Sequence, residues 1–423
     1  MASEDAIYRE SSQFRLWSFS PGQLADLRAQ TNALAVSTIR EARQRGLEAT
    51  PTSTQTQTQP PSDDPPALTP AEERLLLDFY TVELLRAGKF TEQPTDVQAT
   101  AAIFFRRFYV THSLMTYPPA ALYKTALFFG AKAEGYYHKL DGFAQKFPHT
   151  TAADVLAGEF LLCQGIRFAF DVRHPFRALE GAVMELRRLA DVDALTAAPA
   201  DSADSADSAD SAPASSIPPT SSTLSDTRIS AAHRRAREIL KFSPLITDAY
   251  FHFTPSQIML AALRLADRPL ADRLVAESFR RPSPAATSKK SKKNGEAEWE
   301  RITGSAVCRR VDEALADCQA LLAAEPPERL SDYWGQPVSN NLIKPLLKKL
   351  KACHDPDRWD LVALQQAKRE GAVKAYHHNA LPEDASVFGK SLAAVSATPD
   401  PGLHEAKRRK VAKALDDPFG PPL

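Results

Sequence analysis

Cysteine, glycine and net charge are scarce in this chain, and each scarcity excludes a class of protein. Among 423 residues there are 16 glycines and 4 cysteines, and 52 basic residues balance 52 acidic ones. A chain without net charge has no general attraction to nucleic acid or to a membrane surface. Scattered cysteines without a CxxC pair are typical of reduced thiols in an intracellular protein. They are Cys163, Cys308, Cys318 and Cys353.

Long apolar runs and catalytic motifs are also lacking. No run approaches the ~20 apolar residues that span a bilayer, and the start, MASEDAIYRE, is not a signal peptide because it is acidic and has no apolar run. The ten histidines form no HxxxH or HExxH group, and the chain has no phosphate-binding glycine loop and no GxSxG. We therefore expect no membrane span, no cofactor, no metal site and no catalytic residue.

Proline and helical periodicity are abundant instead, with 32 prolines clustered in linkers and at helix starts. The stretch Phe104–Lys132 predicts two helices joined by a Pro-Pro turn, and the second of these is apolar almost all the way round. Such a helix must be surrounded by other helices. We therefore predict a helical bundle around residues 119–131, with Lys132 at the point where the buried helix emerges.

Apolar spacing and capping residues predict further helices along the chain. The expected ranges are 21–45, 70–87, 95–111, 118–131, 138–146, 151–167, 176–191, 254–266, 269–279, 297–323 and 339–353, and residues 228–250 are expected to be ordered. The segments YPPAALYKTALFFGAK and FTPSQIMLAALRLA share an aromatic residue, a proline and an Ala/Leu-rich helix. This weak repeat predicts two bundles of about five helices each.

Three stretches have no residues that form a core, and we expect them to be disordered. They lie at 49–70, 201–212 and 283–296, the second of which holds four DSA repeats. The basic runs KKSKK and KRRK are either nuclear-localisation or anion-binding patches, or solvated charge runs.

One charged residue interrupts an apolar stripe in the helix expected at 151–167. The stripe consists of Leu156, Glu159, Cys163 and Ile166. A carboxylate in such a place needs a partner, and Lys132 is the candidate. The alternative is a helix-end lysine that the helix dipole favours and an unrelated glutamate at the stripe's edge. Phe168 and Phe170 follow with alternate spacing and are either core or binding residues.

The segment SSQFRLWSF near the N-terminus has four large apolar residues in a short space, outside a regular pattern. They are Phe14, Leu16, Trp17 and Phe19. Leaving them in water costs about 1.5–3 kcal/mol each relative to burial. We therefore expect this segment to be docked on the second bundle or on a partner.

These motifs resemble the cyclin H family of transcriptional cyclins. FFRRFYVTHSLMTYPPAALYKTALFFGAKAE resembles the core of a cyclin box, and ITDAYFHFTPSQIMLAALRLA resembles the second box of the family. SSQFRLWSFSPGQLADLRAQTN is similar to the family's start, and EFLLCQGIRFAFDVRHPFRALEG to the end of the first box and its link to the second. The two inserts depart from the family pattern, and EERLLLDFY replaces the substrate-docking motif of cell-cycle cyclins.

The resemblance implies an all-α protein with two tandem five-helix cyclin folds, additional N- and C-terminal helices and disordered inserts. The implied segments are an N-terminal segment and helix at 1–48, a linker at 49–69, a first box at 70–170, a second box at 171–324 with inserts at about 193–226 and 282–297, and a C-terminal helix and tail at 325–423.

The resemblance also implies a nuclear, non-enzymatic subunit that binds and activates the kinase of the CDK-activating kinase complex. Its further partners would be the complex's ring-finger assembly subunit and the core of transcription factor IIH, without direct contact to nucleic acid or membrane. The implied kinase-binding residues are Lys132, Glu159, Glu134, Cys163, Phe168, Phe170 and Trp17. Two alternatives remain: a transcriptional cyclin with a different kinase, and a kinase-free cyclin-fold adaptor that binds DNA.

Overall fold

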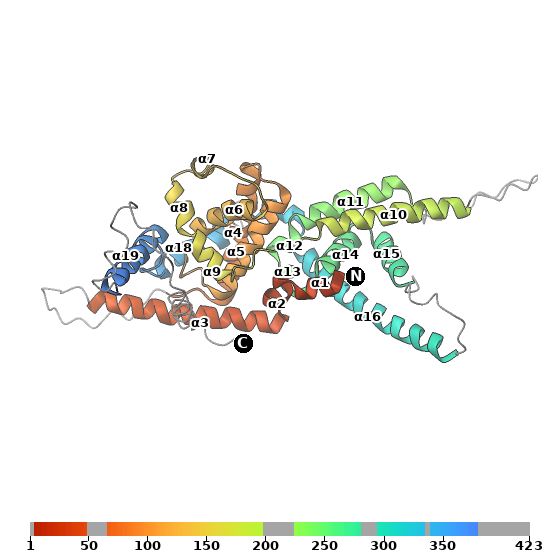
Figure 1. Cartoon of the computed structure of the whole chain (residues 1–423), viewed down its shortest axis with the longest axis horizontal. Coiled ribbons are helices and arrows are strands. Elements are labelled where there is room, and N and C mark those ends of the chain that lie inside the picture. Colours follow the sequence, from red (N-terminus) through yellow and green to blue (C-terminus); the bar gives the residue numbers. More distant parts are fainter. Residues whose placement is uncertain (1–3, 49–65, 198–223, 281–293, 335–338, 380–423) are drawn as a thin grey trace, which may run out of the picture. The chain divides into compact units, whose positions relative to one another are not determined.

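Every regular element in the described part of the chain is a helix, which confirms the expected all-α class (Figure 1). This computed structural model describes residues 4–48, 66–197, 224–280, 294–334 and 339–379. Residues 1–365 form one compact unit, which contains every contact described below, and residues 366–423 form another.

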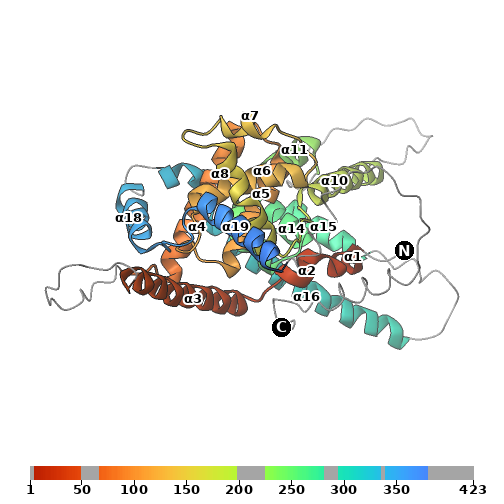
Figure 2. The same ribbon diagram turned by 60° about the vertical axis from the view of Figure 1, so that its left-hand side comes forward.

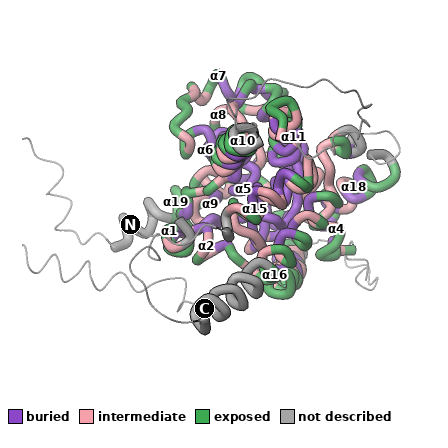
Figure 3. Tube along the Cα trace, turned by 90° about the vertical axis from the view of Figure 1, so that its right-hand side faces the viewer, coloured by how far each residue is buried: buried purple, intermediate pink, exposed green. Residues whose placement is uncertain are grey.

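A first group of helices packs around α6, as the sequence predicted. The group consists of α4 (Pro70–Phe90), α5 (Thr95–Thr111), α6 (Pro119–Ala133), α7 (Leu140–Ala144), α8 (Ala152–Ala157) and α9 (Glu159–Gly165). The α6 side chains Leu122, Leu127 and Phe128 are at most 4% exposed. Figure 3 shows that buried residues are concentrated along α5, in the interior of this helix group. Helix α6 lies so close to α5 that a Cβ on Gly130 would be 2.9 Å from that of Ala101.

A second group packs around α14 in the same way. It consists of α10 (Phe176–Ala197), α11 (Asp226–Leu240), α12 (Ser243–Ile246), α13 (Ala249–His252), α14 (Pro255–Ala266), α15 (Arg268–Arg280) and α16 (Asn294–Ala324). A capping box between Thr254 and Gln257 starts α14. Helices α10 and α16 extend into the ranges 193–226 and 282–297, so the inserts expected there are shorter than predicted. The remainder of both inserts, residues 49–65 of the linker and both basic runs lie outside the described residues. The last part of the linker was wrongly expected to be disordered, because Leu68 is 1% exposed in the core and Thr69 caps α4.

The N-terminal segment is more regular than we expected, because it forms α1 (Glu4–Glu10) and α2 (Ser12–Trp17). The hydroxyl of Ser11 caps α2. The long helix α3 (Pro21–Glu48) follows, and it packs along the first group (Figure 1). Its Thr31 hydroxyl donates a hydrogen bond of 3.0 Å to the carbonyl of Val110.

The single helix expected at 151–167 is wrong, since the structure divides it into α8 and α9 at Gly158. A Cβ at that position would lie 2.8 Å from a methyl carbon of Leu122 and 3.0 Å from the Thr125 hydroxyl. The close approach to α6 explains why glycine stands here, and the break gives α9 its own N-terminus, at Glu159.

The C-terminal region contains the helical segment expected at 339–353, as η3 (Ser339–Ile343) and α18 (Lys344–Cys353). It has two further helical elements that were not expected, η2 (Pro327–Trp334) before this segment and α19 (Leu361–Asn379) after it. Helix α18 packs beside α4 (Figure 2). Helix α19 lies where only a polar tail was predicted. Its start is marked by Asp360, whose carboxylate accepts hydrogen bonds from the amides of Val362 and Ala363.

Candidate partner-binding surface

Lys132 and Glu159 form the ion pair that the sequence suggested. The Lys132 Nζ lies 2.6 Å from a carboxylate oxygen of Glu159 and 4.8 Å from the ring centroid of Phe128. Lys132 stands in the last turn of α6 and Glu159 in the first turn of α9, where the helix dipoles favour a cation and an anion respectively. Of the two alternatives that the sequence left open, the structure shows the pair, and the unrelated glutamate is wrong; the helix-end position of Lys132 is compatible with both.

The pair retains capacity for a further partner. The side chains of Lys132 and Glu159 are 41% and 20% exposed. An ammonium has three N–H donors and a carboxylate has two oxygens, and the ion pair engages one of each. A carbonyl and an amide of a docked chain can bond to the others.

Four exposed apolar side chains lie close to Glu159 in the sequence. One is in α8, one is in α9 and two are on the turn that follows α9. We call this set the phenylalanine patch, and it consists of Leu156, Phe160, Phe168 and Phe170, which are 37%, 61%, 56% and 40% exposed. The ring centroid of Phe168 lies 6.4 Å from that of Phe160 and 6.2 Å from that of Phe170. Contiguous exposed apolar surface is typical of a protein-binding site. Sequence reasoning missed Phe160, which stands directly after Glu159.

The turn that carries Phe168 and Phe170 has an unusual backbone. Arg167 and Phe168 have φ angles of +56° and +53°. The left-handed region costs a residue other than glycine about 1–3 kcal/mol. The amide of Phe168 donates a hydrogen bond of 2.9 Å to the carbonyl of Cys163, which closes the end of α9. A Cβ on Gly165 would lie 2.3 Å from the Phe108 ring, so α9 sits directly on α5 here.

Cys163, which was also expected at the binding surface, is a half-buried thiol of α9 that packs against the core. Burial, and then the charge of Glu159, raise the pKa of this thiol. The protonated thiol is a weak nucleophile, so Cys163 contributes packing here.

Glu134 was expected at the binding surface, but its carboxylate is engaged inside the protein. It accepts a hydrogen bond of 2.5 Å from the Thr100 hydroxyl, which also lies 2.8 Å from Nε2 of His174. Nδ1 of His174 lies 2.8 Å from the hydroxyl of Tyr250. Burial lowers the pKa of His174 to about 3, and the charge of Arg107 acts in the same direction. This chain of hydrogen bonds joins the two helix groups, and the structure revises the expectation for Glu134 accordingly.

Trp17 was also expected to bind a partner, but its side chain is only 1% exposed. Its ring lies 5.4 Å from the guanidinium carbon of Arg107 and 5.9 Å from that of Arg167. A contact residue has to reach the surface, so the structure revises this expectation: Trp17 packs behind the phenylalanine patch.

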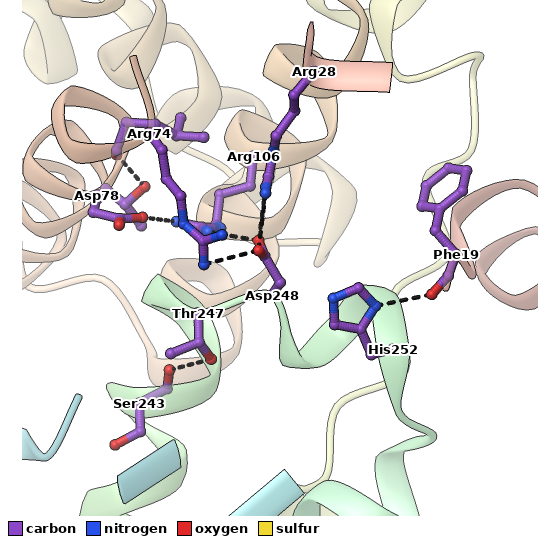
Figure 4. Close-up of polar contacts among 11 residues, drawn as sticks. Phe19, Arg28, Arg74, Asp78, Arg106, Ser243, Thr247, Asp248 and His252 are labelled. Atoms are coloured by element: carbon purple, nitrogen blue, oxygen red, sulfur yellow. Dashed lines mark hydrogen bonds and ion pairs between the residues drawn. The ribbon is translucent and has the colours of Figure 1, made fainter. Parts of the chain in front are cut away.

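The N-terminal segment is docked on the second helix group, one of the two outcomes that we expected. The amide of Phe19 donates a hydrogen bond of 2.8 Å to the carbonyl of Phe251. Nδ1 of His252 donates one of 2.8 Å to the carbonyl of Phe19 (Figure 4).

Sequence reasoning missed a buried charge cluster around Asp248, between α3, the first group and the second (Figure 4). Arg28 binds both carboxylate oxygens, at 2.7 and 2.9 Å. The guanidinium groups of Arg74 and Arg106 lie 2.9 and 3.1 Å from the same carboxylate. Arg106 also forms an ion pair of 2.6 Å with Asp78. We call these residues the Asp248 cluster.

The cluster's arginines keep Asp248 ionised. Burial by itself would raise the pKa of this carboxyl group, but the Arg28 hydrogen bonds and the charges of Arg106 and Arg28 outweigh burial and lower the pKa. The side chain of Asp248 is 5% exposed and that of Arg106 is 1% exposed. No spacing rule relates these residues, which are up to 220 positions apart.

No three His, Cys, Asp or Glu side chains in the described ranges come together in a way that could hold a metal ion. In the same ranges, no helix is both long and apolar enough to cross a bilayer.

Comparisons with known proteins relate the chain to one family. The family described as "Cyclin C-terminal domain" matches residues 174–325, which include the second helix group. The chain is 29% identical to Cyclin CCL1 of Saccharomyces cerevisiae over 279 residues, which are 66% of this chain and 62% of that protein. It is 33% identical to Cyclin mcs2 of Schizosaccharomyces pombe over 178 residues, which are 42% of this chain and 54% of that protein.

A solved structure extends the likeness to nearly the whole chain, whereas the matches to the two yeast cyclins span only 62% and 54% of their lengths. A chain of the CAK complex from Chaetomium thermophilum, bound to ATP-gamma-S, is 43% identical. The alignment covers 94% of this chain and 100% of that chain, with a TM-score of 0.68. On this agreement of sequence and fold, the protein belongs to the cyclin family.

Proposed function

We propose that this cyclin is the regulatory subunit of a cyclin-dependent kinase in a CDK-activating kinase complex. The observation that carries the proposal is the Lys132–Glu159 pair at the edge of the exposed phenylalanine patch. The 43% identity to a chain of the Chaetomium thermophilum CAK complex supports this choice of complex. In this proposal the chain itself catalyses no reaction.

The two helix groups suit two tandem cyclin folds, one over 70–170 and one over 171–324. In each group a buried helix, α6 or α14, is surrounded by its neighbours. We propose that the first fold presents the kinase-binding surface. The second fold supports it through the Asp248 cluster and the N-terminal segment.

The mechanism is allosteric. A protein kinase is active when its αC glutamate is paired with its β3 lysine and its activation loop is ordered. A kinase αC helix that docks on the phenylalanine patch is held in the inward position. Lys132 donates hydrogen bonds to carbonyl groups of the docked backbone, and Glu159 accepts them from its amides. Phe168 and Phe170 receive the apolar side chains of that helix.

The free energies of the apolar contact and of the ion pair can be compared with the free energy that kinase activation requires. Moving a kinase from about 1% to about 99% active requires roughly 5.5 kcal/mol of differential binding. Burying the exposed half of a phenylalanine or leucine gives about 1 kcal/mol, and a hydrogen bond to a charged group gives about 1.5–3 kcal/mol. The patch and the pair together therefore reach the size required. The four patch residues, at about 1 kcal/mol each, and the two charged side chains, at one such hydrogen bond each, contribute comparable amounts, so both are needed for the shift.

The remaining partners follow from the same proposal. The complex would contain a ring-finger assembly subunit and would bind the core of transcription factor IIH in the nucleus. There the kinase would phosphorylate the C-terminal domain of RNA polymerase II during transcription initiation.

The test compares two ion pairs of the same chemistry. Lys132→Ala and Glu159→Ala each remove one member of the candidate site. Lys349→Ala is the matched control, because Lys349 and Glu72 also lie 2.6 Å apart but between α18 and α4. Affinity purification with mass spectrometry identifies the bound kinase, and a kinase assay at limiting cyclin measures activation.

We expect both site variants to weaken activation and the control to retain it. Equal activation by all three variants would reject the site. Purification of a kinase from outside the CDK-activating complex would favour the first alternative. Salt-dependent DNA binding without any kinase would favour the adaptor alternative.

A further inference from the structure

The turn between α9 and the second helix group is held in a conformation that its own residues disfavour. Arg167 and Phe168 are consecutive left-handed residues, which L side chains rarely adopt. Such a conformation persists only where the surrounding structure imposes it. This turn also presents Phe168 and Phe170, half of the phenylalanine patch, so whatever imposes the conformation also shapes the patch.

The support comes from behind, from α2. The Trp17 ring lies near the guanidinium groups of both Arg107 and Arg167, at 5.4 and 5.9 Å from its centroid. Arg107 is itself 1% exposed and donates a hydrogen bond of 3.2 Å to the carbonyl of Ala169. The tryptophan therefore contacts one residue of the turn directly and a second through Arg107.

A second residue of α2 fixes the far end of the same segment. Gln13, which is 0% exposed, accepts a hydrogen bond of 2.7 Å through Oε1 from the amide of Arg173. Gln13 and Trp17 are four positions apart and so lie on one face of the helix. That face contacts residues 167–173 at both ends.

The indole N–H of Trp17 is buried without a hydrogen-bond partner. The ring, rather than its polar atom, accounts for the contact. Phenylalanine at this position would keep a flat ring beside the two guanidinium groups and would lose the unpartnered N–H.

We propose that Trp17 and Gln13 are positioning residues for partner binding. They hold residues 167–173 so that Phe168 and Phe170 face outward in the geometry a docked helix needs, and they do not touch the partner themselves. The N-terminal segment thus acts on the binding surface from inside the cyclin. This inference rests on the proposed function and adds to it the residues that determine the shape of the site.

The first half of the test needs no partner. Amide hydrogen exchange is measured on the full chain for wild type, Trp17→Ala and Gln13→Leu. Arg15→Ala is the matched control, because Arg15 is an exposed residue of the same helix. We expect the amides of Phe168, Ala169 and Arg173 to exchange about tenfold faster or more in the first two variants, and at the wild-type rate in the control. Unchanged exchange in Trp17→Ala and Gln13→Leu would overturn the inference.

The second half measures kinase affinity with the same proteins. We expect Trp17→Ala to weaken kinase binding about tenfold, equivalent to about 1.4 kcal/mol. Trp17→Phe should retain most of the wild-type affinity. In a background that carries both Phe168→Ala and Phe170→Ala, the same Trp17→Ala change should have little further effect, because residues that act through one contact are not additive. A full, additive loss in that background would overturn positioning through the turn.

The two hypotheses fail in different ways. If the wild-type chain binds no kinase while the exchange results are as expected, the proposed function is wrong and the structural support of the turn stands. If the kinase binds and Trp17→Ala changes neither exchange nor affinity, the positioning role is wrong and the proposed function stands. If Trp17→Ala fails to fold, Gln13→Leu provides the same comparison of exchange and affinity.

Discussion

The Asp248 cluster and the Lys132–Glu159 pair contain the same kinds of charged group in different surroundings. Three arginines surround one carboxylate that is 5% exposed, and the cluster joins α3, the first helix group and the second. The Lys132 side chain, by contrast, is 41% exposed. A buried charge must be satisfied by its own chain, whereas a charge at the edge of an apolar surface can also bond to a partner. Burial, more than residue type, separates an architectural ion cluster from a binding site.

Removing the centre of the buried cluster is expected to have the largest effect. Asp248→Ala leaves the guanidinium groups of Arg28 and Arg106 without their shared carboxylate. Breaking a buried pair in this way costs about 3–5 kcal/mol, which urea denaturation should show as a lower free energy of unfolding. Asp193→Ala is the control, because its partner Arg273 and Asp193 itself are 38% and 48% exposed, and exposed pairs contribute about 0–1 kcal/mol. Equal losses in both variants would remove the distinction between buried and exposed clusters.

The exposed pair should show the opposite behaviour. Lys132→Ala is expected to lower the affinity for the kinase by about 2 kcal/mol or more, because one partner of a charge pair buried in the complex is lost. The free chain should lose less than about 1 kcal/mol of stability. Isothermal titration and thermal denaturation of the same samples measure the two quantities. A large drop in stability with unchanged affinity would make the pair architectural too.

Two glycines test whether the packing beneath the phenylalanine patch is tight, by comparison with an open position. Gly165→Ala places a methyl group against Phe108 and should destabilise the fold by about 1–3 kcal/mol. Gly181 lies in α10, and a Cβ added there would have no neighbouring atom within 4 Å, so Gly181→Ala should stabilise by about 0.4–1 kcal/mol. Thermal denaturation compares them. A neutral Gly165→Ala would mean that the helix beneath the patch can shift.

The hydrogen-bonded chain through His174 gives the smallest effect at neutral pH, and this effect grows as the pH falls. Because burial lowers the pKa of His174 to about 3, the unfolded chain binds a proton there at a higher pH than the folded one. Stability should therefore fall as pH drops from about 6.5 toward 3, by at most about 1.4 kcal/mol per pH unit. Urea denaturation of wild type and His174→Gln across this range measures the slope difference. Parallel curves would show that His174 does not titrate with unfolding.

Local pattern determined the helices and part of the site. The apolar periodicity and the prolines at helix starts placed α4, α5, α6 and α14 near their observed bounds, because a helix start and an apolar face are properties of neighbouring residues. The need of Glu159 for a partner and the position of Lys132 at a helix end predicted their ion pair for the same reason.

Only the tertiary structure decided which of these side chains face outward. The break at Gly158 depends on the approach of α6, and the inward turn of Glu134 depends on Thr100 and on His174 beyond it. The burial of Trp17 depends on two arginines that are distant in the sequence, and the Asp248 cluster joins residues from three separate regions. Burial and charge pairing arise between distant segments, and a local pattern carries no information about which distant segment will be there.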